Sequence, residues 1–134
     1  MIASLGFLIQ GILQHREAPT TLLRSAVALW ITNILVFARW YWKLDAGGPH
    51  ERDRARGRLA SSFLFPQMLG QSGQEPSWSP HFMDYLFLAF NTSTAFSPTD
   101  TAVLSRWAKA VAMLQSLISL TIIALLAARA VNIL

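Results

Sequence analysis

The sequence predicts an all-α integral membrane protein, a single membrane domain over residues 1–134 with an outer helix, a re-entrant half-helix and loop, and an inner helix. Three observations lead to this fold class. The composition is 53% hydrophobic and only 13% charged, which is too apolar for an ordinary soluble domain. Two apolar stretches are long enough to cross a bilayer, whose hydrocarbon core takes about 20 helical residues. A third apolar stretch is too short to cross and runs into a polar segment.

The two spanning helices are predicted from length and polarity. The outer helix covers residues 21–44, TLLRSAVALWITNILVFARWYWKL. Its cations, Arg24 near one end and Arg39 and Lys43 near the other, can extend to the two membrane interfaces. The inner helix covers residues 101–134, which contain a long uncharged run.

Residues 1–14, MIASLGFLIQGILQ, are apolar and are predicted to form a short helix. They lack the basic residues that open a signal peptide. The stretch fits a thin additional span, the end of a longer span, or a helix on the membrane surface, and the sequence leaves these three alternatives open.

A long loop is predicted over residues 45–80. Its first part is rich in Gly and in charges of both signs, which is typical of a solvated loop. The apolar patch SSFLFPQM, residues 61–68, is interrupted by Pro66 and is expected at the membrane interface. Residues 81–94, HFMDYLFLAFNTST, are predicted to form a half-helix, because at 1.5 Å per residue they cover only part of a bilayer.

The aromatic residues favour a half-helix that enters and leaves the membrane on one side. Trp and Tyr prefer the membrane–water interface. A re-entrant path places Trp40, Tyr41, Trp42, Trp78 and Trp107 at the same interface. A half-helix that lies sideways on the membrane surface is the alternative.

The segment after the half-helix, residues 95–100, is predicted to be a loop. Irregular backbone at membrane depth is tolerated only where protein or water surrounds it. Two spans and a half-helix offer too little surface to shield such a loop from lipid. We therefore expect a homo-oligomer.

Residues 84–100, DYLFLAFNTSTAFSPTD, resemble the pore helix and filter of the two-transmembrane potassium channels, a family of pore-loop ion channels. Asp84 stands at an acidic position near the start of the pore helix. Phe90, Thr92 and Thr94 match the aromatic and threonines at its end, and Asp100 matches the acid after the filter. The resemblance implies a pore domain, a tetramer, monovalent cations as permeating ions, and a location in the cell membrane.

The filter itself departs from the family. Ala95 replaces the filter threonine, Phe96 replaces valine, Ser97 and Thr99 replace the two glycines, and Pro98 replaces tyrosine. In the family, backbone carbonyls replace the hydration shell of the ion, and glycine reaches the positive φ that this arrangement requires. We therefore expect no standard potassium filter. The filter-like loop comprises Thr92, Ser93, Thr94, Ala95, Phe96, Ser97, Pro98, Thr99 and Asp100.

Part of this loop has a second interpretation. Ser97 is a good N-cap, Pro98 a good first helical residue, and Asp100 completes a Ser-x-x-acid capping pattern for the inner helix. Asp100 then either caps the helix alone or also attracts cations at a pore mouth. The hydroxyls of residues 92–94 either line a vestibule or bond to local backbone.

Polar residues inside the spans also have alternative roles. Gln115 and Ser119 share a helical face and either line a pore or bond between helices, which is the commoner role. Asn33 is expected to bond between helices. His81 and Asp84 could share a proton or a metal ion, although a lone His near an interface usually has neither role.

Several function classes are disfavoured. The chain has no cysteine, and it shows no carboxylate pair, His cluster or Ser–His arrangement, so we predict no catalytic residue, no metal site and no cofactor. No basic stripe with interleaved aromatics suggests nucleic acid. The predicted function is a tetrameric cation channel in the lipid bilayer without a standard potassium filter. The alternative is a non-conducting, channel-derived membrane scaffold or subunit.

The orientation predictions disagree. Lys and Arg are more numerous on the side of the long connection, so the positive-inside rule places that connection in the cytoplasm. The resemblance to potassium channels places it outside, and the expectation from sequence follows the resemblance.

Overall fold

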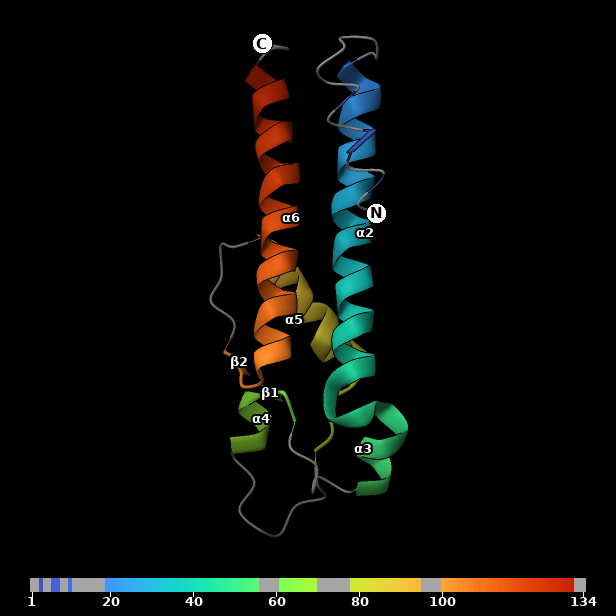
Figure 1. The fold of residues 1–134 in the computed structure, drawn as a ribbon, viewed down its shortest axis with the longest axis vertical. Helices are drawn as coiled ribbons and strands as arrows, with labels where there is room; N and C mark the ends of the chain where they lie inside the picture. The colour runs from blue at the N-terminus through green and yellow to red at the C-terminus, as the bar shows by residue number, and fades with distance from the viewer. Residues whose placement is uncertain are drawn as a thin grey trace.

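The computed structural model describes residues 19–55, 61–69, 78–94 and 100–131, together with positions 3, 6, 7 and 10. Two long apolar helices, α2 (Pro19–Leu44) and α6 (Arg106–Val131), run antiparallel, and the shorter helix α5 (Phe82–Thr94) packs against both. Figure 1 shows α5 crossing behind the two long helices. The predicted arrangement of two long helices and a short middle helix is confirmed. The short helix predicted over residues 1–14 lies largely outside the described residues.

Helix α2 ends in a turn that its glycines make possible. A short 3-10 turn, η1 (Asp45–Gly47), follows Leu44. Gly47 and Gly48 have φ of 79° and 98°, values that side chains disfavour. A Cβ on Gly48 would lie 3.0 Å from the backbone oxygen of Lys43. The Gly48 N–H donates to the carbonyl of Asp45 at 2.9 Å, which closes the turn.

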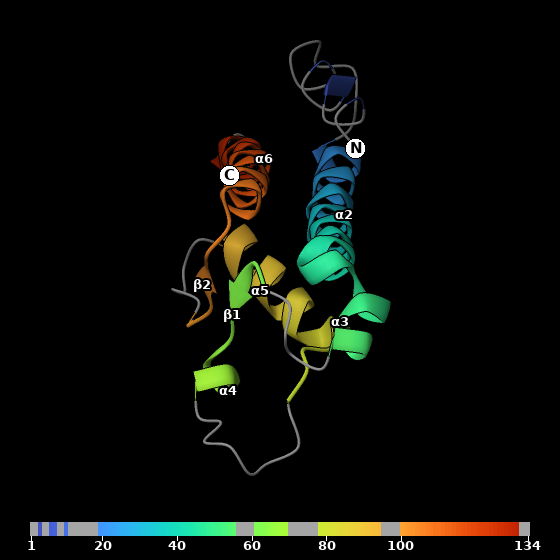
Figure 2. The same cartoon turned by 60° about the horizontal axis from the view of Figure 1, so that its bottom comes forward.

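The connection predicted as a loop contains regular elements. Helix α3 (Pro49–Ala55), strand β1 (Phe63–Leu64) and helix α4 (Pro66–Leu69) lie within it. Strand β1 pairs antiparallel with β2 (Ala102–Val103). Figure 2 turns toward the viewer the end of the molecule where these elements gather, which is where α2 ends and α6 begins. We call this the α2–α6 junction end.

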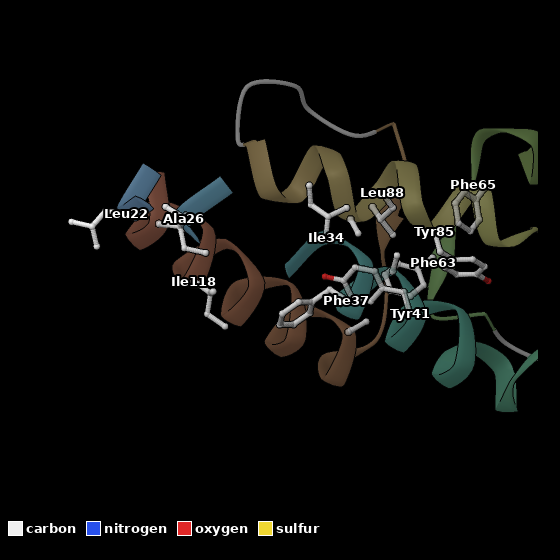
Figure 3. Packing of buried hydrophobic residues seen from close by; sticks show 14 residues of the cluster. Leu22, Ala26, Ile34, Phe37, Tyr41, Phe63, Phe65, Tyr85, Leu88 and Ile118 are labelled. Carbon is white, nitrogen blue, oxygen red and sulfur yellow. The ribbon is translucent and has the colours of Figure 1, made fainter. Parts of the chain in front are cut away.

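Residues 61–68 are expected at a membrane interface, and this location stays a prediction, but their aromatic side chains are turned toward protein. Phe63 and Phe65 are buried, because alternate side chains of an extended segment point to one side, here inward. The Phe63 ring lies 5.2 Å from the Tyr41 ring and 6.0 Å from the Tyr85 ring, centroid to centroid. Figure 3 shows these three rings close together. They join the end of α2, β1 and α5 into one core.

The inner helix begins later than predicted. Residues 101–105 were expected to be helical, but Ala102 and Val103 form β2 and α6 starts at Arg106. The Ser105 hydroxyl accepts from the Ala108 N–H at 3.3 Å, so Ser105 is the N-cap. The predicted capping of this helix by residues 97–100 is therefore wrong. Pairing of β2 with β1 holds this segment extended until Ser105.

Little of the apolar surface of the long helices is buried inside the chain. Only 33% of the most apolar window of α2 is buried inside the chain, and only 17% of that of α6. Both helices are long and apolar enough to cross a membrane. The core helix of a soluble protein would bury most of such a window. The exposed apolar residues of the long helices include Leu23, Val27, Ile31 and Leu35 of α2, and Met113, Leu114, Leu117 and Leu120 of α6.

Candidate functional site

Helix α5 starts at the α2–α6 junction end and stops halfway along the long helices. At its start, the Phe82 ring lies 5.8 Å from the ring of Trp42, near the end of α2. At its other end, Ser93 hydrogen-bonds to Ser119, near the middle of α6. The described chain resumes at Asp100, and β2 then leads to the start of α6. The chain thus enters and leaves this region from the same end.

The start of α5 is capped by its own acid. The Asp84 carboxylate accepts from the backbone N–H of His81 at 2.7 Å, and the Asp84 N–H donates to the His81 carbonyl at 3.0 Å. This is half of a capping box. It uses the carboxylate in a backbone hydrogen bond rather than in a contact with the exposed imidazole of His81.

Gln115 connects all three helices. Its side-chain oxygen accepts from the Tyr41 hydroxyl at 2.6 Å, and its side-chain nitrogen donates to the Ala89 carbonyl at 2.7 Å. Gln115 is fully buried, so each of these hydrogen bonds replaces one that water would otherwise make. The side chain holds α2, α5 and α6 in a fixed register.

A second set of buried hydrogen bonds lies further along the long helices. The Asn33 side-chain nitrogen donates to the Ser119 hydroxyl at 2.9 Å, and the Ser119 and Ser93 hydroxyls bond to each other. The Ser116 hydroxyl donates to the Thr92 carbonyl at 3.4 Å. The prediction that Asn33 bonds between helices is confirmed. Together these bonds attach the last turn of α5 to the middle of both long helices.

The hydroxyls of the filter-like loop that the structure describes bond to protein. Thr92 donates to the Leu88 carbonyl at 2.8 Å, and Thr94 donates to the Asn91 carbonyl at 3.1 Å. Ser93 is buried against Ser119, as described above. Residues 95–99 of the loop, Ala95, Phe96, Ser97, Pro98 and Thr99, lie outside the described residues. Asp100 is exposed.

The residues proposed to line a pore, Gln115 and Ser119, are both buried inside the chain. Their polar groups point toward α2 and α5. In this arrangement they bond between helices. The exposed side of α6 at this depth carries apolar side chains instead, such as Met113 and Leu117, each 63% exposed.

Asp45 is a functional candidate that the sequence did not reveal. Its carboxylate is fully buried and accepts from the Tyr85 hydroxyl at 2.6 Å, the Ser61 hydroxyl at 2.7 Å and the Ser62 N–H at 2.6 Å. The Ser62 hydroxyl accepts from the Trp107 indole N–H at 3.0 Å. Asp45 thus links the end of α2 to α5 and to the segment before β1. A buried carboxylate with such partners is stable only while they remain in place.

Within the described residues, no three His, Cys, Asp or Glu side chains gather closely enough to hold a metal ion. Comparisons of the chain with protein-family models, with curated proteins and with solved structures found no match.

Proposed function

We propose that this chain is a membrane protein in which α2 and α6 span the bilayer and α5 enters it only halfway. Two features support this proposal. The long helices bury only a small share of their apolar stretches inside the chain, as expected where lipid covers the rest. Trp40 and Trp42 lie near the end of α2, Trp107 lies at the start of α6, and Trp78 packs against Phe65. All four therefore lie around the α2–α6 junction end, where an interface would hold their indoles.

The observation that carries the proposal furthest is the attachment of the last turn of α5 to the middle of both long helices. The hydrogen bonds of Asn33, Ser93 and Ser119 lie at that level. In a bilayer this level is near the centre of the hydrocarbon core, where unsatisfied polar groups are costly. A half-helix held there supports the pore-loop architecture expected from the resemblance.

We further propose that copies of the chain assemble around α5 and α6. One face of α5 exposes Met83, Phe87 and Phe90, of which Met83 is 69% and Phe87 62% exposed. These residues are three or four positions apart and share a face. A neighbouring copy that covers this face would bury these apolar side chains. Four-fold assembly is the arrangement that the resemblance favours.

Such an assembly would conduct monovalent cations without selecting potassium over sodium. Exposed Asp100, repeated by symmetry, would attract cations at the mouth. The expected lack of selectivity rests on the sequence of the filter-like loop, which contains no glycine.

The burial of Gln115 and Ser119 favours a second candidate function, a non-conducting membrane scaffold or subunit. The exposed face of α6 carries Met113, Leu117 and Leu120, and a pore lined by this face alone would be apolar. Apolar constrictions exclude water and block ions. Conduction therefore requires that the polar loop, rather than α6, provides the ion path.

One preparation tests both candidates. The purified chain is reconstituted in liposomes, and its mass in mild detergent and its flux of potassium and sodium are measured together. We expect an oligomer that conducts both ions at similar rates, with reduced flux at low ionic strength for Asp100→Asn. The matched control is Glu51→Gln, which removes an exposed carboxylate on α3. An oligomer without flux supports the scaffold, and a strictly monomeric protein contradicts both candidates.

A further inference from the structure

We propose that the α2–α6 junction end binds the phosphate groups of anionic phospholipids. This inference rests on the proposed membrane location but not on conduction or assembly. It concerns a surface formed by two helices that are far apart in the sequence.

The surface carries exposed cations from both long helices. Arg39 and Lys43, four positions apart, lie in the last turns of α2. Arg106 and Lys109, three positions apart, lie in the first turn of α6. Because α2 and α6 run antiparallel, all four lie at the same end of the molecule (Figures 1 and 2). None of the four makes an ion pair within the described residues.

The described acids at this end do not neutralise these cations. The Asp45 carboxylate is buried and accepts from Tyr85 and Ser62. The Asp84 carboxylate accepts from a backbone N–H, and Glu51 lies 3.9 Å from Arg54, its ion-pair partner. Exposed Asp100 is not in an ion pair with any described cation. Among the residues that the structure describes, the surface therefore has unbalanced positive charge, although acids and cations nearly cancel in the sequence of the connection.

An anion from outside the chain would stabilise the start of α6. Its first turn contains no acidic side chain, and cations there oppose the positive end of the helix dipole. Natural helices usually place acids at this position. Phosphate groups from outside the chain would compensate both the dipole and the two side chains.

The aromatic residues identify the source of that phosphate as a membrane. Trp40 is 45% exposed on α2, next to Arg39, and Trp107 follows Arg106 on α6. Indoles that lie beside cations at the end of an apolar helix are typical of the headgroup layer of a bilayer. Binding of a soluble phosphate compound would not require these apolar neighbours.

The opposite end provides the contrast. There α2 carries exposed Arg24, separated from the Trp-rich end by most of the helix. Arg24 is therefore the matched control cation. Like Arg39, it is an arginine on α2, but it lies outside the proposed surface.

The test measures lipid preference at the protein surface in vesicles that contain both phosphatidylglycerol and phosphatidylcholine. Spin-labelled versions of each lipid report the fraction that is immobilised by the protein. We expect preference for phosphatidylglycerol. Arg39→Gln/Lys43→Gln and Arg106→Gln/Lys109→Gln should each reduce it several-fold, because a cation near an anionic surface contributes roughly a factor of five in binding. Arg24→Gln removes one cation at the opposite end of α2 and should reduce the preference less than either paired variant.

Three further results separate the explanations. Raising the salt concentration should weaken the preference of the wild-type protein, which gives a test that does not depend on the folding of a variant. Inorganic phosphate should weaken it only as much as another salt of equal ionic strength. Equal immobilisation of both lipids, or a loss with Arg24→Gln as large as with the paired variants, would overturn this inference alone. Immobilisation of neither lipid would overturn the membrane proposal together with it.

Discussion

Asp45 stands out among the individual residues because it joins parts of the chain that local forces cannot hold together. It lies where α2 ends, and its partners Ser62 and Tyr85 are 17 and 40 residues further along the chain. Hydrogen bonds to a charged group contribute more than neutral ones, about 1.5–3 kcal/mol each. In a chain with many exposed apolar side chains, such polar contacts set the relative position of the helices.

We predict that Asp45→Asn lowers the free energy of unfolding by about 1.5–3 kcal/mol, because the amide keeps the size but loses the charge and turns one acceptor into a donor. Chemical denaturation in detergent micelles measures this change. Combining Asp45→Asn with Tyr85→Phe should cost less than the sum of the single variants. The control is Asp100→Asn, at an exposed position, where we expect a change within about 0.5 kcal/mol. Equal effects at Asp45 and Asp100 would contradict the proposed role of Asp45.

Sequence alone could not assign these roles. Asp45 looks like a loop residue, because it precedes Gly47 and Gly48 and its partners are distant. Gln115 and Ser119 were recognised as facing one side of a helix, but a helical repeat does not tell whether that side meets protein or a pore. Their partners Tyr41 and Asn33 on α2 decide the question, and only the packing of α2 against α6 identifies them.

At the scale of elements, the sequence predicts well those helices whose limits depend on nearby residues. Helix α2 needs only a long apolar run, and α5 lies within one residue of its predicted limits, 81–94. The start of α6 was not predicted, because β2 depends on pairing with β1, which lies near residue 63. A Ser-x-x-acid pattern is a local signal, and in this chain the strand pairing outweighed it.

We predict that Ser105→Ala destabilises the protein by about 1 kcal/mol, the usual contribution of an N-cap serine. Ser105→Asp should restore most of the loss, because aspartate is also a good cap and favours the positive end of the helix. Thermal unfolding followed by far-UV circular dichroism measures both changes. Asp100→Asn is again the matched comparison, since Asp100 belongs to the cap expected from sequence. A larger loss at Asp100 than at Ser105 would mean that the helix begins earlier than Arg106.

At the scale of the whole molecule, the described part of the chain buries polar side chains beside an apolar core, while many other apolar side chains face outward. The hydrogen bonds of Asp45, Gln115 and Ser119 are buried, whereas Leu35 and Leu117 are exposed. Lipid cannot drive apolar helices together, so packing and interhelical hydrogen bonds must hold them. The buried polar contacts of this chain suit that requirement, and they stand at successive levels from the α2–α6 junction end to the middle of the long helices.

The distribution of exposed charge leads to a prediction of orientation. Arg39, Lys43, Arg106 and Lys109 lie at the α2–α6 junction end without acidic partners among the described residues, whereas α2 exposes Arg24 at the other end. Cytoplasmic segments near spanning helices are enriched in Lys and Arg, and anionic lipids give the cytoplasmic leaflet a negative surface potential. We therefore predict that the α2–α6 junction end faces the cytoplasm, opposite to the orientation that the resemblance to potassium channels implies.

The absence of cysteine from the chain makes this orientation directly measurable. His50→Cys places a thiol at an exposed position of α3, and Thr21→Cys places one at an exposed position at the opposite end of α2. A maleimide that cannot cross membranes is added to spheroplasts that express either variant. We expect Thr21→Cys to react in intact spheroplasts and His50→Cys to react only after permeabilisation, when both must react as a control. The reverse pattern would place the α2–α6 junction end outside, and the exposed cations would then face the outer leaflet, where the positive-inside rule does not explain them.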